Sequence, residues 1–202
     1  GDNVMSKRIY ISADYSDSNG DREVVEIIHK WCNDNLHKID FIDTASGPDS
    51  VSNKPDCRAC DLKNEFNSRI NSSSAVIFIV GDKTKLREAG SKCERFKKNQ
   101  SDCYCTPYKQ NTHGEKQCKV FLTVPATSGV GCINDYSYLQ HEFEQAKIME
   151  KDIIIFYNSS RKECNWLPPY MNEYIADAQP FWIIKYGYRV GNYEFFKQRL
   201  GY

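Results

Sequence analysis

An acidic residue stands in the apolar stripe of a segment that is typical of a helix leading into a buried strand. The segment runs from Tyr136 to Asn158, and its helical stripe consists of Leu139, Phe143, Ala146 and Met149. Glu142 projects into this stripe, whereas Glu144 and Lys147 face the opposite side. Burying an unpaired carboxylate is costly, so Glu142 must become neutral, find hydrogen-bond donors or open into a cleft. The alternative is a rim glutamate that reaches solvent near the first turn of the helix, where negative charge is favoured.

Polar and aromatic residues follow the predicted strands. They are Ser12, Asp14, Tyr15, Asp43, Asp82 and Lys83. In parallel sheets, ligands bind outside the carboxyl ends of the strands, so we expect these residues to meet the first turn of the Glu142 helix at one rim. Tyr15, Tyr138 and Trp166 offer aromatic faces on which a flat base could stack, with ordinary packing as the alternative. For Ser12, Asp14 and Asp43 the alternative to substrate binding is turn formation.

The cysteines form a second cluster that could do chemistry. Cys57-x-x-Cys60 and Cys103-x-Cys105, with Cys93, His113 and Cys118 nearby, supply more than enough ligands for a tetrahedral zinc ion. Only the first pair has the usual spacing for such a site. Cys57, Cys60, Cys103 and Cys105 are therefore candidate ligands of a structural zinc, and free thiols in a reducing cell are the alternative.

Histidines and the remaining thiols give weaker signals. His29, His37 and His141 lie on or beside predicted helices, where we expect solvated faces, and Cys32 lies on an apolar face and is expected in the core. His141 adjoins Glu142 in the chain but points about 100° away around a helix, so it is not an obvious general base for that carboxylate. The cysteine count of nine is odd, which argues against a framework made only of disulfides.

Composition excludes several classes of protein. Lys and Arg together number 27, as do Asp and Glu, so the chain of 202 residues has no net charge. It therefore lacks the broad positive field that non-specific binding to nucleic acids or anionic membranes requires. No apolar run is long enough for a membrane span, and residues 1–8 lack the core of a secretory signal. We therefore expect a soluble, cytoplasmic protein. The glycine motifs of dinucleotide-binding folds and P-loops are also absent from the sequence.

Apolar runs and helical periodicities alternate along the chain. The predicted order is strand Lys7–Ala13, helix Asp21–Asn35, strand Ile39–Thr44, helix Asp61–Ile70, strand Ala75–Gly81, helix Tyr136–Glu150, strand Asp152–Tyr157, strand Phe181–Lys185 and helix Tyr193–Leu200. Residues 82–135 interrupt this rhythm as an insertion, with one strand-like piece at Lys119–Ala126. The alternation predicts an α/β domain over 6–202, with a parallel sheet of about five strands and helices on both faces. Residues 1–5 are expected to be unstructured or foreign to the domain.

Two segments carry a resemblance to a known family. KRIYISADYSD, followed by the helix with Trp31, and the distant YLQHEFEQAKIMEKDIIIFYN resemble the TIR-like proteins of bacteria and archaea, especially the TIR-like component of Thoeris antiphage systems. Members share a basic, aromatic-rich first strand that ends in Ser and an aromatic-Asp turn, and a later helix that begins with an aromatic residue and Glu. This chain departs from the pattern at Tyr138, where a tryptophan often stands, and in its cysteine-rich insertion.

The resemblance implies a flavodoxin-like TIR fold that cleaves the nicotinamide–ribose bond of NAD, with Glu142 as the catalytic residue. For the Thoeris group it also implies cyclisation of ADP-ribose into a signal that activates a separate effector protein. Such chemistry fits a single carboxylate, because the nicotinamide leaves as a neutral ring and needs no proton. Two alternatives remain: a non-catalytic TIR-like module that acts by self-association, and a receiver that takes phosphate on Asp14 or Asp43.

Overall fold

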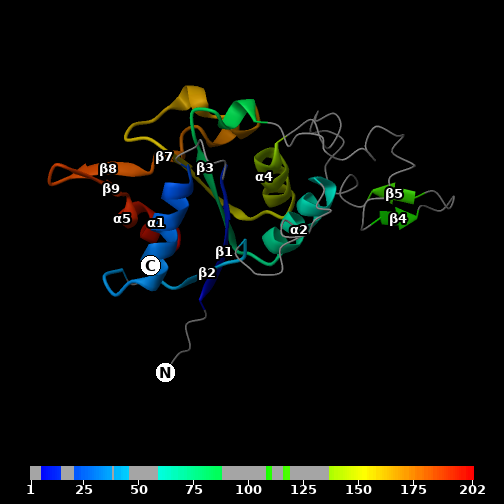
Figure 1. Ribbon diagram of the computed structural model, residues 1–202, viewed down its shortest axis with the longest axis horizontal. Helices are drawn as coiled ribbons and strands as arrows, with labels where there is room; N and C mark the ends of the chain where they lie inside the picture. The colour runs from blue at the N-terminus through cyan, green and yellow to red at the C-terminus, as the bar shows by residue number, and fades with distance from the viewer. Residues whose placement is uncertain are drawn as a thin grey trace. The chain divides into compact units, whose positions relative to one another are not determined.

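A five-stranded sheet, parallel throughout, forms the centre of the fold (Figure 1). Its strands are β1 (Lys7–Ser12), β2 (Phe41–Asp43), β3 (Ala75–Val80), β6 (Asp152–Tyr157) and β7 (Gln179–Pro180). They lie in the order β2-β1-β3-β6-β7, which is the order of flavodoxin-like sheets. The prediction of an α/β protein with a parallel sheet of about five strands is confirmed.

The computed structural model describes residues 6–14, 21–37, 39–45, 59–87, 108–110, 116–118 and 137–202, with the backbone alone for 59–64, 108–110 and 116–118. The chain divides into two units. The sheet unit comprises Gly1–Ala45, Ser72–Leu86 and Lys151–Tyr202, and the second unit comprises Ser46–Asn71 and Arg87–Glu150. The second unit is thus drawn from two stretches of the chain, one of which overlaps the predicted insertion at 82–135.

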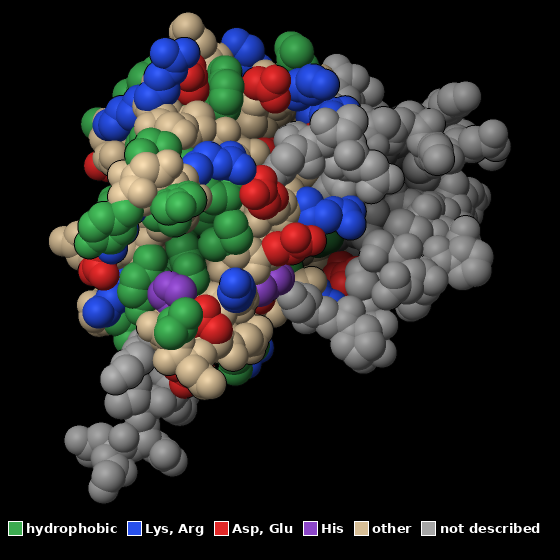
Figure 2. Space-filling view, turned by 60° about the vertical axis from the view of Figure 1, so that its left-hand side comes forward, with side chains coloured by type: hydrophobic (Ala, Val, Ile, Leu, Met, Phe, Trp, Pro, Cys, Tyr) green, Lys and Arg blue, Asp and Glu red, His purple; other side chains and the backbone are tan. Residues whose placement is uncertain are grey.

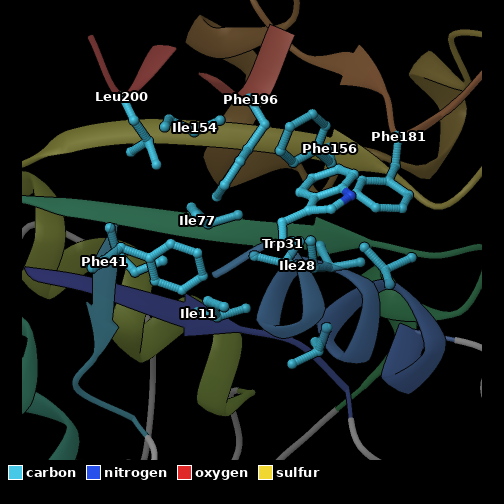
Figure 3. Close-up of a cluster of buried hydrophobic side chains, with 14 of the residues drawn as sticks. Ile11, Ile28, Trp31, Phe41, Ile77, Ile154, Phe156, Phe181, Phe196 and Leu200 are labelled. Carbon is cyan, nitrogen blue, oxygen red and sulfur yellow. The ribbon is translucent and has the colours of Figure 1, made fainter. Parts of the chain in front are cut away.

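Helices α1 (Asp21–Asn33) and α5 (Tyr193–Arg199) belong to the sheet unit and contribute to its hydrophobic core. Helix α1 buries Val24, Val25, Ile28 and Trp31, which recur at helical spacing and form its inward face. The Trp31 ring lies 5.2 Å from Phe196 of α5 and 5.5 Å from Phe181, centroid to centroid (Figure 3). Aromatic packing therefore links α1, α5 and the end of the sheet in one core.

Alternate residues of the inner strands point to the opposite face, and they are buried as well. This second set is Tyr10, Ser12, Val76, Phe78, Val80, Ile153, Ile155 and Tyr157. All six residues of β3 are buried. Burial of both sets explains why the sequence of β3 is a continuous apolar run rather than an alternating one.

The end of the chain differs from the prediction of one strand over Phe181–Lys185. Only Gln179 and Pro180 pair with β6, whereas β8 (Trp182–Lys185) turns away and forms an antiparallel hairpin with β9 (Tyr188–Gly191). The turn places Tyr186 at φ 52° and Gly187 at φ 79°. Two consecutive positive φ values match the right-handed twist of a hairpin, which explains the reversal of the chain at this point.

Short 3-10 helices complete the sheet unit. They are η2 (Thr84–Leu86), η5 (Cys164–Trp166) and η6 (Pro169–Tyr174). Pro168 precedes η6 and Pro169 is its first residue, and because neither has a backbone N–H to donate, no α-helix continues from η5 into η6. None of the helices in the described ranges is long and apolar enough to cross a membrane.

The second unit contains α2 (Ala59–Asn71), the hairpin strands β4 (Tyr108–Gln110) and β5 (Lys116–Cys118), and α4 (Tyr138–Ile148). The Ser137 hydroxyl caps α4 by accepting a hydrogen bond from the Gln140 amide. Of the predicted apolar stripe, Leu139, Phe143 and Ala146 are buried. Met149 is 40% exposed, so its placement in the stripe is wrong, because α4 ends at Ile148 and Glu150 follows at φ 52°. The predicted strand Lys119–Ala126 lies outside the described residues.

Candidate functional site

The sheet unit presents a candidate site where β1 and β3 end. The chain passes from β1 to β2 at one edge of the sheet, and from β3 to β6 toward the opposite edge. The direction in which successive strands are added therefore reverses between β1 and β3. In sheets of this order, ligands bind at that reversal, outside the carboxyl ends of the strands. Ser12 ends β1 beside Phe78 of β3, and it is 1% exposed. Its hydroxyl has no hydrogen-bond partner in the described part of the chain, so it could bond a ligand at this point.

A buried carboxylate lies close to the ends of β3 and β6. Asp21 is the first residue of α1 and is 0% exposed. The Asn158 side-chain amide, directly after β6, donates to Asp21 Oδ1 at 2.8 Å. Gly81, directly after β3, is what permits this approach, because a Cβ there would lie 2.8 Å from Asp21 Oδ1. The start of α1 therefore lies against the carboxyl edge of the sheet, where Asn158 after β6 bonds Asp21 and Gly81 after β3 leaves room for it.

Asn158 also connects this edge to the β8–β9 hairpin. Its Oδ1 accepts a hydrogen bond from the Trp182 indole at 2.7 Å. The Arg189 guanidinium of β9 lies 3.9 Å from the centre of the Trp182 ring and pairs with Glu23 of α1 at 3.2 Å. Sequence reasoning did not identify Asn158 or Trp182. The only signal was an amide residue placed directly after an apolar strand.

Asp14 follows β1 and is half-buried, as a residue near this edge should be. Asp82 and Lys83 follow β3 and are exposed. Tyr15 lies outside the described residues. Trp166 is half-buried in η5, one of the elements of the sheet unit.

Along the strand direction, Asp43 lies short of Ser12, which marks the carboxyl end of β1. The register pairs Ile9 with Asp43 on one side and with Ala75, the first residue of β3, on the other. Asp43 therefore stands about 10 Å from the end of β1, three residues at the usual rise of a strand. The expected placement of Asp43 on the same rim as Ser12 is wrong, because β2 is short and is paired with the first half of β1.

The contacts of Asp43 match the turn-forming alternative. Its Oδ1 accepts the amide of Ala45 at 2.9 Å, and its Oδ2 lies 2.7 Å from His29 Nε2. His29 is only 36% exposed, so it is a partner of Asp43 rather than a fully solvated residue. Both carboxylate oxygens are thus engaged with protein groups.

In the second unit, Glu142 lies in the middle of α4 and is only 5% exposed. Glu142 is therefore not a rim glutamate that extends into bulk solvent. Tyr138 precedes it by one turn on the same side of the helix and is half-buried. The Tyr138 ring packs edge-on against Phe66 of α2 at 5.7 Å, so packing within the unit orients it.

His141 is buried, contrary to the expectation of a solvated face. It is 1% exposed, and its Nε2 lies 2.7 Å from the Asn67 side-chain oxygen of α2. One turn further, the Gln145 amide donates to the Asn71 side-chain oxygen at 2.8 Å. Polar contacts at successive turns thus join α4 to α2, and His141 serves this packing.

The candidate zinc ligands are not placed by the structure. Cys57, Cys103 and Cys105 lie outside the described residues, and for Cys60 only the backbone within α2 is described. Within the described ranges, no three His, Cys, Asp or Glu side chains are arranged to hold a metal ion. Cys32 is half-buried and its thiol donates to the Phe41 carbonyl at 3.0 Å, in keeping with a packing role.

No protein-family model matches the chain, and no curated protein matches it.

Proposed function

We propose that this chain is a TIR-like enzyme that cleaves the nicotinamide–ribose bond of NAD. The proposal includes the flavodoxin-like TIR fold and, as a further step, cyclisation of the ADP-ribose product into a signal nucleotide for an effector protein in antiphage defence. The observation that carries it is the burial of Glu142, 5% exposed in the middle of α4. A glutamate side chain is seldom almost fully buried, so its burial in α4 makes Glu142 a candidate functional group.

The proposed reaction needs one carboxylate and a dry site. As the bond from the ribose carbon to the nicotinamide nitrogen breaks, its electron pair stays on nicotinamide and positive charge develops on the ribose. Glu142 stabilises that charge, an effect that is strongest where water is excluded. A water molecule, or a nucleophile within the same nucleotide, then bonds to the ribose carbon and loses a proton. Cyclisation requires that the internal nucleophile reaches this carbon first.

The proposal assigns substrate-binding roles to Ser12, Asp14, Tyr15 and Tyr138. Ser12 is the best supported by contacts, because its buried hydroxyl has no partner in the described part of the chain. Asp43 is less well suited, since both its oxygens are engaged by His29 and Ala45. NAD enters as the substrate, and a structural zinc in the cysteine-rich stretch is a separate proposal that metal analysis of the purified protein would test.

The decisive experiment is incubation of the purified protein with NAD, followed by chromatography of nicotinamide and of the ribosyl product. The test variant is Glu142→Gln, which keeps the size of the side chain and removes its charge. The matched control is Glu144→Gln, two residues away on the same helix and half-exposed. Loss of about 100-fold or more in the first variant alone supports the proposal, the range expected for an electrostatic catalytic group. Activity that survives Glu142→Gln would remove this residue from the mechanism.

A non-catalytic interaction module is the second candidate, and the β8–β9 hairpin favours it. Ile184, Tyr186 and Tyr188 are 66%, 89% and 74% exposed. Figure 2, which brings this side of the molecule forward, shows hydrophobic side chains at the surface among Lys and Arg. Exposed apolar groups of this kind mark contact surfaces. A protein that is inactive on NAD at every concentration, and that self-associates through this hairpin, would favour the second candidate.

A further inference from the structure

The tip of the β8–β9 hairpin carries a bulky residue in an unfavourable backbone conformation. Tyr186 and Gly187 form the turn, at φ 52° and φ 79°. This left-handed region suits glycine or asparagine, whereas a tyrosine is disfavoured there by its Cβ. The Tyr186 side chain is 89% exposed, so packing within the protein does not offset the cost. Strain at an exposed ring points to a contact with something outside the chain.

The base of the hairpin is held in the core of the sheet unit. The Trp182 indole donates to the Asn158 side-chain oxygen at 2.7 Å. Gly191 lies so close to Trp31 and Phe181 that a Cβ there would meet both rings at less than 3.0 Å. Figure 1 shows the two strands extending from β7 as an arm, with the turn at its far end. The strained turn is therefore presented on a fixed support.

Exposed side chains lie on both faces of this arm rather than on one. Ile184 is directly opposite Arg189 in the ladder, and all of the last rung before the turn is formed by Lys185 and Tyr188. Because side chains alternate between faces along a strand, these two pairs point to opposite faces. Each face thus combines an exposed apolar or aromatic side chain with an exposed cation, and Tyr186 stands beyond both pairs.

This distribution of side chains fits an environment that encloses the tip on all sides. A flat protein surface would cover one face of the arm and leave the other exposed, whereas the interface of a lipid bilayer surrounds an inserted turn. Tyrosine rings favour the depth of the lipid headgroups, and isoleucine favours the apolar layer below them. Lysine and arginine keep their charges among the headgroups while their aliphatic stems lie along apolar groups.

The charges of the hairpin select the kind of bilayer. No Asp or Glu occurs from residue 178 to residue 193. The Lys185 ammonium lies 5.9 Å from the centre of the Tyr186 ring and has no ion pair in the described part of the chain. Arg189 shares its charge with Glu23 at 3.2 Å, so it contributes less. Two hairpins packed together would bring like charges into contact, whereas anionic lipids neutralise them, and this local attraction needs no net charge on the whole chain.

We propose that the tip of the β8–β9 hairpin inserts into the interface of anionic membranes, with Tyr186 at its apex and Lys185 among the headgroups. Ile184 and Tyr188 lie beside the apex and enter the apolar side of the interface. The contact is peripheral, so it requires no membrane-spanning helix. It depends neither on Glu142 nor on NAD, so its test is independent of the proposed enzymatic function.

The test is co-sedimentation of the 202-residue chain with two kinds of vesicle, in the absence of NAD. One kind is phosphatidylcholine alone, and the other contains about one third phosphatidylserine, an anionic lipid. We expect binding to the anionic vesicles to be about fivefold tighter, the usual effect of one unpaired cation near such a surface, and to weaken in high salt. Equal binding to the two kinds of vesicle, or binding to neither, would overturn the proposal.

Tyr186→Asn and Lys185→Gln test the hairpin itself. Asparagine tolerates the positive φ of the turn, so the first variant should keep the fold while it loses the ring. We expect each variant to weaken binding to the anionic vesicles about fivefold or more. Leu36→Ser is the matched control, because Leu36 is 85% exposed but lies outside the hairpin, and it should bind as the wild type does.

Two results with these variants would contradict membrane insertion. Unchanged vesicle binding by both Tyr186→Asn and Lys185→Gln would assign the binding to another surface. A change in oligomeric state, measured by analytical ultracentrifugation without vesicles, together with unchanged vesicle binding, would make the hairpin a contact between copies of the chain.

Discussion

The side-chain amide of Asn158 bonds Asp21 with its nitrogen and Trp182 with its oxygen, at 2.8 Å and 2.7 Å. One residue after β6 thus donates to Oδ1 of a buried carboxylate at the start of α1 and accepts from the indole at the start of the β8–β9 hairpin. The backbone amide of Asn158 also donates to the Val80 carbonyl at 2.8 Å, so the residue is held by the sheet itself. Asn158 is therefore the point at which β3, β6, α1 and the hairpin are joined.

Replacement of Asn158 by Ala should destabilise the sheet unit by about 1–3 kcal/mol, because it removes a donor from a fully buried carboxylate and an acceptor from a buried indole. Urea unfolding followed by the fluorescence of Trp182 and the other tryptophans would measure the change. Asn165→Ala is the control, because Asn165 is exposed and contributes only its backbone carbonyl to a hydrogen bond. Equal stability of Asn158→Ala and the wild type would show that Asp21 is satisfied without Asn158.

Replacement of Gly191 by Ala should disturb the aromatic core. A Cβ at this position would lie 2.6 Å from Cζ2 of Trp31 and 2.9 Å from Cζ of Phe181, and both rings are buried. Rigid rings cannot move away without displacing their neighbours, so we expect a loss of about 1–3 kcal/mol in the free energy of unfolding. The control is Gly187→Asn in the same hairpin, which meets no atom and keeps a residue that tolerates φ +79°. A neutral Gly191→Ala would show that α1 adjusts freely against the hairpin.

Elements whose signal is local were predictable from the sequence. The bounds of β6 agree at Asp152 and Tyr157, and α1 begins at Asp21 as expected. In β6 a continuous apolar run suffices, because the strand is buried on both faces. In α1 the apolar periodicity fixes both the type of element and its inward side.

Features that depend on distant partners were not predictable. The level of Asp43 follows from the pairing of β2 with the first half of β1, where the Thr44 hydroxyl contacts the Ile9 carbonyl and Ser73. The burial of His141 depends on Asn67, which lies 74 residues earlier in the chain. The hairpin turn Tyr186-Gly187 lacks the Asn-Gly signal of such turns, so the sequence predicts neither β9 nor the reversal after β8. The placement of Glu142 within its helix was predictable, and its chemical role is still a prediction.

Tyr157 should make stability depend on pH in the alkaline range. Its pKa is raised from 10.0 to about 12 because burial, first, and Cys164, second, disfavour the phenolate. As pH rises above 10, the unfolded chain loses this proton while the folded protein keeps it, so stability falls until the folded pKa is reached. The slope due to this group is at most about 1.4 kcal/mol per pH unit. Urea unfolding between pH 8 and 12 would show a shallower decline in Tyr157→Phe, whereas Tyr186→Phe, at an exposed site, should follow the wild type.

Replacement of Asn67 by Leu should weaken the contact between α2 and α4. Asn67 and His141 are 5% and 1% exposed, and their side chains are 2.7 Å apart, so loss of the amide leaves a buried imidazole without this partner. We expect a cost of about 1–3 kcal/mol, with a smaller cost for the double variant Asn67→Leu, His141→Leu, which removes both polar groups. Circular dichroism during urea unfolding would compare the wild type, the single variants Asn67→Leu and His141→Leu, and the double variant. Additive losses in the double variant would mean that the two side chains act independently and that this contact does not hold α4, and with it Glu142, against α2.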